Sequence, residues 1–270
     1  MEGQRDTPQE FAAGMRRANG IARVILERAC AAVAPGVSTD ALDELVHALC
    51  VEHGAYPAPL GYRNFPKSVC TSVNECVCHG IPDARPLDEG DVLTIDVSVY
   101  VDGFYGDNAM TVGVGTVSAA TQDLMAVAKE CMMAGIAVAA DGVPYREVGR
   151  SVAEAATKHG FDSVRDFGGH AIGRSLHLPP TIPFVAESFL PADLLMKTGD
   201  AFTVEPMVTA GREDSALQGI VQVAHWPDNW SVVSASGERA AQYEHCVLVS
   251  DDGAEIITDA KYAEMPAPTT

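Results

Sequence analysis

Residues 93–111 read LTIDVSVYVDGFYGDNAMT and predict a β-hairpin. Apolar residues occupy every second position from Leu93 to Val101, which is the period of a strand with one buried face. Asp102 and Gly103 follow as a two-residue turn of the kind that joins antiparallel strands. A return strand is expected from Phe104 onward. An antiparallel sheet is therefore the first part of the fold that the sequence indicates.

The turn also determines which residues of the two strands face each other. It places Val101 opposite Phe104. Ser98 then faces Asp107, and Asp96 lies diagonally from Asp107 on the same face of the sheet. Diagonal neighbours have backbones about 7–8 Å apart, so their two carboxylates can reach a shared cation. Without a cation these side chains would repel each other.

Acidic residues recur in apolar or glycine-rich segments further along the chain, together with one histidine. An isolated charge would be costly to bury in such segments. The five residues are Asp96, Asp107, His170, Glu205 and Glu244. Four carboxylates and one imidazole suit a pair of divalent metal ions. The set predicts metal-assisted hydrolysis.

The remaining patterns predict a mixed α/β (α+β) chain. Helices are expected at 8–34, 39–54, 118–139 and 144–159, the first starting at Thr7 or Pro8. Loops and short strands are expected over 55–90 and 161–182, and a loop over 183–198. Ala201–Glu205 and Gln242–Val249 are predicted strands, with Pro206 ending the first, and hairpins are expected around Pro227-Asp228 and Ser236-Gly237.

The order helix, helix, strands occurs twice and suggests two related halves. We expect a single catalytic domain, residues 1–270, with halves at about 8–117 and 118–260. Residues 264–270 are expected to be a disordered tail. Two of the predicted ligands come from the first half and three from the second, so the site is expected at the seam.

Composition excludes several classes of protein. A chain of 270 residues with 47% hydrophobic residues can bury a sizeable core. The longest apolar runs fall short of the ~20 residues of a membrane span, and the polar N-terminus lacks a signal peptide's apolar stretch, so a cytoplasmic protein is expected. Seven cysteines without a CxxC pair suit reduced thiols. A net charge of −19 argues against nucleic acid as a partner.

Five motifs give the chain a resemblance to a known family. They are CTSVNECVCHGIPD (70–83), IDVSVYVDGFYGDNAMT (95–111), GGHAIGRSLHLPP (168–180), FTVEPMV (202–208) and AQYEHCVLV (241–249). In this order they resemble the type I methionine aminopeptidases of the M24 metallopeptidase family, over roughly residues 8–260. The short bacterial form is expected, since no long N-terminal domain precedes the motifs. The resemblance implies the pita-bread fold, in which two pseudo-symmetric halves surround a curved antiparallel sheet with helices outside.

The resemblance also implies roles for the predicted ligands. Asp96 would bind one metal ion, His170 and Glu205 the other, and Asp107 and Glu244 would bridge them. The ions would be two divalent cations, Mn²⁺, Fe²⁺ or Co²⁺, with Zn²⁺ possible. A hydroxide between them would attack the first peptide bond, and Glu205 would act as general base.

Further residues match the family's substrate site. His79 would contact the scissile amide nitrogen, and His177 would support the carbonyl oxygen as charge develops there. The pocket for the methionine side chain would be lined by Tyr62, Phe65, Cys70, Leu176 and Trp230. The expected substrates are N-terminal methionyl peptides and nascent chains with a small second residue. A monomer with transient ribosome contact, and without membrane or nucleic-acid partners, is expected.

Several departures from the family and several alternatives accompany this interpretation. Ala171, Leu176 and the sequence Leu178-Pro179-Pro180 differ from many members and put substrate breadth in question. A cysteine nucleophile at Cys70 is disfavoured, because no base is evident beside it. Cys76 and Cys78 lack the second cysteine pair of a zinc site. A prolidase-like enzyme, another peptide substrate, or a metal-free binding module are the rival functions.

Overall fold

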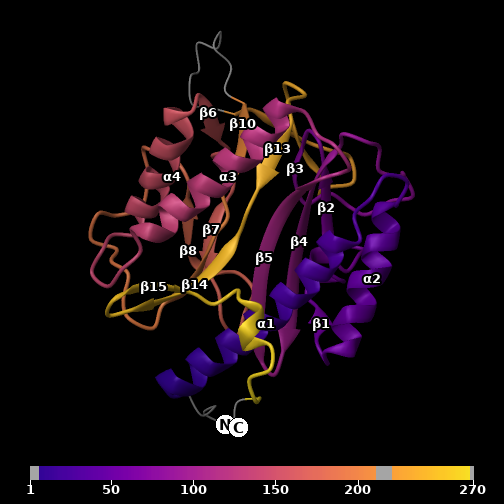
Figure 1. The fold of residues 1–270 in the computed structure, drawn as a ribbon. Coiled ribbons are helices and arrows are strands. Elements are labelled where there is room, and N and C mark those ends of the chain that lie inside the picture. Colours follow the sequence, from indigo (N-terminus) through magenta and orange to yellow (C-terminus); the bar gives the residue numbers. More distant parts are fainter. Residues whose placement is uncertain (1–5, 211–220, 268–270) are drawn as a thin grey trace.

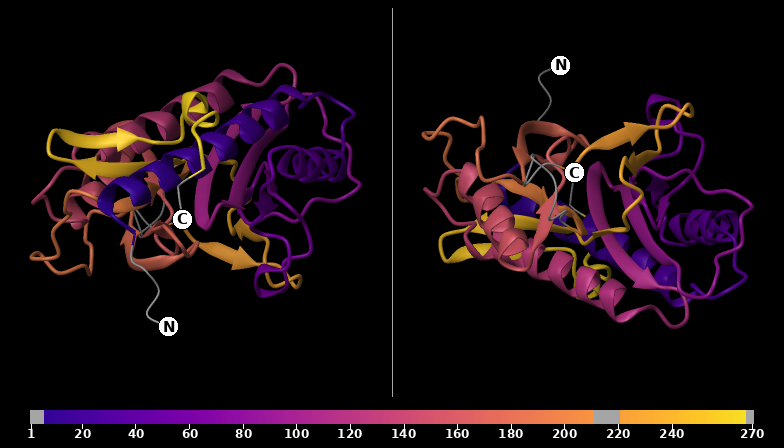
Figure 2. Two further views of the ribbon diagram at one scale, coloured as in Figure 1. Left: turned by 90° about the horizontal axis from the view of Figure 1, so that it is seen from below. Right: turned by 90° about the horizontal axis from the view of Figure 1, so that it is seen from above.

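The computed structural model of the chain describes residues 6–210 and 221–267. Antiparallel sheets lie inside, and the α-helices of these residues pack around them (Figure 1). The mixed α/β class predicted from the sequence is confirmed. Figure 2 shows that α1 and α3 lie on the same side of the sheets, with α2 beyond the edge of the β4–β5 hairpin.

The elements follow the order expected from the sequence. The helices are α1 (Pro8–Ala31), α2 (Thr39–Glu52), α3 (Ala119–Ala137) and α4 (Arg146–Lys158), with short 3-10 helices at Tyr62–Asn64 and Ala260–Tyr262. The strands of the first part are β1 (Tyr56–Pro57), β2 (Cys70–Val73), β3 (Cys76–Cys78), β4 (Val92–Val101) and β5 (Phe104–Gly113). Those of the second part are β6 (Phe161–Ser163), β7 (Gly168–Ala171), β8 (Leu178–Pro183), β9 (Ala201–Val204), β10 (Met207–Ala210), β11 (Val223–His225), β12 (Val232–Ser234), β13 (Ala240–Gln242), β14 (His245–Ser250) and β15 (Gly253–Ile256).

The β4–β5 hairpin has the predicted register. Val101 pairs with Phe104, Ser98 with Asp107, and Asp96 with Ala109. The odd-numbered residues of β4 are buried in the core that α1 and α2 share with this sheet. Its even-numbered residues face the opposite way, toward the second half of the chain. The alternation in sequence thus separates a packing face from a face that is free for chemistry.

Helix α1 begins where the sequence places it and lies very close to the hairpin. Thr7 and Glu10 form a reciprocal capping box at its first turn. A Cβ atom on Gly106 would lie 2.4 Å from the carbonyl oxygen of Ala18, and one on Gly14 would overlap the ring of Phe104. Glycine at both positions lets helix and strand approach closely, so α1 supports β5 directly behind the acidic residues of the hairpin.

The two largest cores are centred on different parts of the chain, although the first also includes Ile172, Ala201, Cys246 and Leu248 from the second part. The first joins α1 and α2 to β4 and β5. The second joins α3 and α4 to β9 and β14. The two parts meet where β5 lies beside residues 242–244. There the hydroxyl of Thr111 donates to the carbonyl oxygen of Gln242 at 2.7 Å, and the amide of Glu244 donates to the carbonyl oxygen of Ala109 at 2.9 Å.

The predicted strand Gln242–Val249 is wrong as a single element. The structure divides it into β13 and β14, which belong to different sheets, with Tyr243 and Glu244 between them. The partner segment is divided at the same place, since β9 ends at Val204 and β10 begins at Met207. Pro206 cannot donate a ladder hydrogen bond, and the amide of Glu244 bonds to β5 instead.

The interruption brings two acidic residues face to face. Met207 pairs with Gln242 and Val204 with His245, so the register is the same on both sides of the gap. Glu205 is therefore directly opposite Glu244. Like charges opposite each other destabilise a strand pair, so this placement needs an opposing charge.

The loop predictions have mixed outcomes. The hairpin around Pro227-Asp228 is confirmed, because β11 pairs with β12. The hairpin around Ser236-Gly237 is wrong, because β12 pairs with β3 while β13 pairs with β10. Of the predicted tail, 268–270 lies outside the described residues. Within the described ranges, none of the helices combines the length and apolar character needed to cross a membrane.

Candidate active site

One cavity at the junction of the two parts gathers all the residues predicted for the site. It is lined by Tyr62, Phe65, Cys70, His79, Asp96, Asp107, His170, Leu176, His177, Glu205, Trp230 and Glu244, together with Pro59 and Ser98. These residues come from both parts of the chain. The last two were not predicted as site residues.

The acidic side chains form two overlapping groups. Carboxylate oxygens of Asp96, Asp107 and Glu244 lie within 4.8 Å of one another. Nε2 of His170 lies 3.7 Å from Oδ2 of Asp107 and 3.5 Å from Oε1 of Glu205. Because Asp107 belongs to both groups, the five side chains form one continuous set of possible cation ligands.

Buried oxygens without partners show that the site fits a metal. Oδ1 of Asp96 and Oε1 of Glu244 are buried and have no hydrogen-bond partner among the described residues. Buried polar atoms in native proteins almost always have a partner, and these two carboxylate oxygens are free to serve as ligands of a cation. Oxygen and imidazole donors suit a divalent transition ion.

The pKa values point the same way. Burial raises the pKa of Asp96 to about 7. Burial, and less strongly the charge of Asp96, raise that of Glu205 to about 8 against the opposing hydrogen bond from Thr203. Burial and the neighbouring carboxylates also raise the pKa values of Asp107 and Glu244. Four carboxyl groups cannot all be ionised here near neutral pH unless positive charge balances them.

The orientation of His170 leaves one nitrogen free for a metal. Its Nδ1 lies 3.2 Å from the backbone oxygen of Ala171, which can only accept a hydrogen bond. The proton is therefore assigned to Nδ1, and the lone pair of Nε2 points toward Asp107 and Glu205. Burial lowers the pKa of His170 to about 3, so the ring is neutral as a ligand must be.

Thr203 holds two of the predicted ligands in place. Its hydroxyl donates to Oε1 of Glu205 at 2.7 Å and accepts from the amide of His170 at 3.0 Å. The sequence analysis missed this residue. Its position two residues before Glu205 on a predicted strand was the available signal, because such residues share a face.

Asp107 is supported in a similar way. The hydroxyl of Ser98 donates to its Oδ1 at 2.8 Å, and the side-chain oxygen of Asn19 accepts from its backbone amide at 3.1 Å. The predicted register already placed Ser98 opposite Asp107. The contribution of Asn19, from helix α1, required the tertiary structure.

His177 and Tyr62 form a pair at the mouth of the cavity. The hydroxyl of Tyr62 lies 2.9 Å from Nδ1 of His177, whose ring is exposed. Burial lowers the pKa of His177, so the imidazole is neutral near pH 7. If the tyrosine donates to Nδ1, the proton of His177 is on Nε2 and available to an acceptor.

His79 lies deeper and has an unusual backbone. Its φ of 57° is in the left-handed region, which non-glycine residues rarely adopt and which is found often at active sites. Its ring packs edge-on against Trp230 and Phe167 at centroid distances of 5.7 and 5.5 Å. Burial lowers its pKa to about 4.

An apolar recess adjoins the acidic groups. Phe65, Cys70 and Leu176 are buried there, and the ring of Phe65 meets that of Trp230 edge-on at 5.1 Å. Burial raises the pKa of the Cys70 thiol, and nearby Asp96 raises it further. Cys70 is therefore a neutral wall residue, in agreement with its rejection as a nucleophile.

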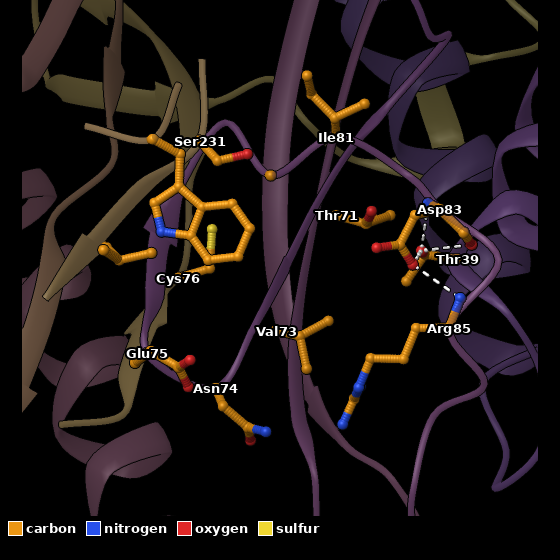
Figure 3. Close-up of a pocket in the computed structure, with 13 residues that line it drawn as sticks. Thr39, Thr71, Val73, Asn74, Glu75, Cys76, Ile81, Asp83, Arg85 and Ser231 are labelled. Atoms are coloured by element: carbon orange, nitrogen blue, oxygen red, sulfur yellow. Dashed lines mark hydrogen bonds between the residues drawn. The ribbon is translucent and has the colours of Figure 1, made fainter. Parts of the chain in front are cut away.

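A second cavity lies on the other side of the β2–β3 segment (Figure 3). Thr71 and Gly80 line it, whereas their chain neighbours Cys70 and His79 line the first cavity. In this second cavity, a side-chain oxygen of Asp83 accepts a hydrogen bond from the amide of Arg85 at 2.9 Å. The backbone amide of Asp83 donates to the hydroxyl of Thr39 at 2.8 Å. None of the residues predicted for the site lines this second cavity.

Comparison with known proteins agrees with this geometry. The sequence model of metallopeptidase family M24 matches residues 13–251 of the chain. Methionine aminopeptidase 1D of Arabidopsis thaliana, a chloroplast and mitochondrial protein, is 43% identical over 90% of the chain, which spans 66% of that relative's length. The methionine aminopeptidase structure from Rickettsia prowazekii is 39% identical, with a TM-score of 0.86, over 94% of this chain and 99% of the other. The corresponding structure from Thermotoga maritima is 30% identical, with the same TM-score, over 95% and 99%.

The raised pKa values predict that the metal-free protein loses stability as pH rises. Asp96 and Glu205, with pKa values of about 7 and 8, keep protons in the folded state that the unfolded chain releases near pH 4. Stability is therefore greatest below about pH 4 as far as these groups are concerned, and is lost through pH 8. We expect a lower Tm at pH 8 than at pH 6 in EDTA, measured by scanning fluorimetry, and removal of the difference by Mn²⁺.

The control for this experiment is the double variant Asp96→Asn, Glu205→Gln, which cannot release these protons. Its Tm should fall less between pH 6 and 8. An equal fall in the variant would assign the pH dependence to other groups.

Loss of the Thr203 hydroxyl is expected to weaken metal binding. Thr203→Val keeps the shape of the side chain but frees Glu205 and the amide of His170. Removal of such supporting partners typically costs 10–100-fold in metal affinity, so we expect a loss of about tenfold for Mn²⁺ by titration calorimetry. Thr198→Val, which removes a surface hydroxyl bonded to Asp251, should leave the affinity unchanged. Unchanged affinity in Thr203→Val as well would refute the supporting role.

Proposed function

The chain belongs to metallopeptidase family M24 and, within it, to the methionine aminopeptidases, and from this premise we propose that it removes methionine from the N-termini of nascent chains. The observation that carries the proposal is the convergence of Asp96, Asp107, His170, Glu205 and Glu244 at one buried centre, two of whose carboxylate oxygens lack partners. A metal-free binding module would have no physical reason to retain such a cluster.

The five ligands would hold two divalent cations, and Asp107 belongs to both groups of side chains. Mn²⁺, Fe²⁺ and Co²⁺ suit these donors, and Zn²⁺ is compatible with them. Bound ions supply positive charge that acidifies an attacking water and stabilises charge on the scissile carbonyl. Glu244 and Asp96 use their unpaired oxygens for this binding.

Glu205 acts as the general base. Its carboxylate lies on the wall of the cavity, with one oxygen fixed by the hydroxyl of Thr203. That bond holds the carboxylate toward the acidic cluster, where it takes a proton from the attacking water. Once cations balance the neighbouring charges, the pKa of Glu205 falls below the value of about 8 that burial imposes.

The two histidines act on opposite ends of the scissile peptide bond. His177 donates from Nε2 to the carbonyl oxygen as negative charge develops, with Nδ1 held by Tyr62. His79 contacts the amide nitrogen and helps to protonate the departing amine, and the proton comes from the attacking water by way of Glu205. The low pKa values of both rings keep them neutral, so neither ring carries a positive charge that would compete with the cations.

The methionine side chain enters the apolar recess. Phe65 and Trp230 give it aromatic walls, and Cys70 and Leu176 give it aliphatic or sulfur contacts. An unbranched thioether packs well in such a recess. A small second residue is favoured, because the contacting rings of Tyr62 and His177 line the cavity beside the acidic groups and would limit the space for it.

The chain works in the cytoplasm as a single catalytic domain and a monomer, with transient ribosome contact. The seven cysteines support a reducing compartment, since those of the described residues are all free thiols. The net charge of −19 supports contact with protein rather than with nucleic acid.

Glu205→Gln tests the proposed base. We expect the variant to fold and to release methionine from the peptide Met-Ala-Ser at least ~10²-fold more slowly, because the proton acceptor is lost. Metal content is measured in the same preparation, since Glu205 is also a proposed ligand. Near-normal turnover would give Glu205 another role, and failure of the wild type to cleave the peptide would overturn the proposed function.

Leu176→Phe tests the width of the methionine recess. A ring at this position adds an aromatic wall and narrows the recess around an unbranched side chain. We expect the ratio of kcat/KM for Met-Ala-Ser to that for Leu-Ala-Ser to rise about three- to tenfold. An unchanged ratio would show that residues other than Leu176 determine the preference for methionine. The matched control is Leu176→Met, which keeps the volume of the side chain.

A further inference from the structure

The face of the β4–β5 hairpin that carries the acidic residues continues beyond them. Along β4 this face presents Asp96, Ser98 and Tyr100 in turn, since alternate residues share a side. On β5 it presents Asp107 and Tyr105. Successive rows are two residues apart, or about 7 Å. The row after Ser98 and Asp107 therefore consists of tyrosines, one step from the reaction centre.

This row extends over three strands. Tyr100 pairs directly with Tyr105 on β5 and with Tyr56 on β1. The rings of Tyr100 and Tyr105 are in contact, with centroids 4.9 Å apart and planes at 51°. Tyr56 and Tyr100 are 52% and 40% exposed, which is unusual for rings on a sheet that has a packed core behind it. We call Tyr56, Tyr100 and Tyr105 the tyrosine row.

The tyrosine row is continuous with the catalytic cavity. Tyr62 lines the cavity and hydrogen-bonds to His177. Ser98 and Asp107, which form the row next to Tyr100 and Tyr105 on the same face of the sheet, also line the cavity. The amide of Tyr105 donates to the carbonyl oxygen of Gly173 at 2.8 Å, in the loop that carries His177.

The cavity is closed at its other end. Cys70 pairs with Asp96 on the same face, and its side chain is buried beside Phe65 in the apolar recess. Cys70, Ser98 and Asp107 are all buried, whereas Tyr100 in the next row is 40% exposed, so this face of the sheet becomes accessible to solvent at the tyrosine row. A substrate peptide whose first residue lies in the buried recess must therefore extend toward the exposed tyrosine row.

We propose that the tyrosine row is a binding surface for the substrate chain beyond its second residue. The occupant is an extended, unfolded peptide whose backbone and side chains lie over the rings. At about 3.4 Å per residue, the row lies two residues from the scissile bond, which corresponds to the third and fourth residues of the substrate. Tyrosine provides rigid contact area that tolerates many sequences, so the surface recognises length rather than sequence. This inference rests on the proposed aminopeptidase function.

The test compares kcat/KM for the tripeptide Met-Ala-Ser with that for two octapeptides that begin Met-Ala-Ser and carry the same five further residues in different order. We expect the wild type to prefer both octapeptides by about tenfold, the usual effect of a few well-packed aromatic contacts. The double variant Tyr100→Ala, Tyr105→Ala should lose this preference, because its kcat/KM for the octapeptides falls much further than its kcat/KM for the tripeptide, which reaches the row with its third residue alone.

Two further variants separate contact from folding. Tyr100→Phe, Tyr105→Phe keeps the rings and should keep the preference. Phe189→Ala removes a ring that is 79% exposed on a different part of the surface and should also keep it. Thermal unfolding of each variant checks that the sheet is intact.

Two outcomes are distinguished by the tripeptide. If the wild type cleaves Met-Ala-Ser but does not prefer the octapeptides, or if the double alanine variant keeps the preference, the inference about the tyrosine row is wrong and the proposed function stands. If the wild type does not cleave Met-Ala-Ser in the presence of Mn²⁺, Fe²⁺ or Co²⁺, the proposed function fails first. A preference for only one of the two octapeptides would show that the enzyme recognises the sequence of the substrate rather than its length. That result would also overturn the inference.

Discussion

Mutual repulsion among buried carboxylates is the constraint on which this structure depends. Glu205 stands opposite Glu244 in an interrupted strand pair, and Asp96 lies diagonally from Asp107 in a hairpin. Each pair alone would destabilise its own strands. Brought together they form a cavity wall that can be fully ionised near neutral pH only when cations balance its charge, so the packing of the two parts itself favours metal binding.

The interruption at Pro206 makes this arrangement possible. An unbroken ladder would satisfy the amide of Glu244 within its own sheet. In the observed structure that amide bonds to Ala109 of β5, and the hydroxyl of Thr111 bonds to Gln242 beside it. The same few residues thus join the two cores and place an acidic side chain from the second part against the hairpin of the first. The hydrogen bonds that form the seam therefore also complete the site.

Residues 93–111 show how much of the fold and the site can be predicted from sequence. Strict alternation and an Asp-Gly turn left one register, and the facing pair Ser98 and Asp107 followed from it. The split of 242–249 could not be predicted in this way, because its cause is a hydrogen bond to a strand more than a hundred residues away. Thr203 and Asn19 were missed for a related reason, since a hydroxyl or amide shows its role only when its partners are placed. The resemblance to the M24 family supplied the residue roles that periodicity alone left open.

The partition between the two cavities has a mechanical consequence. Gly80 lies so close to β2 that a Cβ atom would be 2.1 Å from the carbonyl oxygen of Thr71, and Gly80 adjoins His79 in its left-handed conformation. At Gly80 no side chain separates the two backbone segments, so a shift of Thr71 in the second cavity would also move Gly80. His79 is the adjacent residue in the chain, and the position of its imidazole therefore depends on the packing of the second cavity.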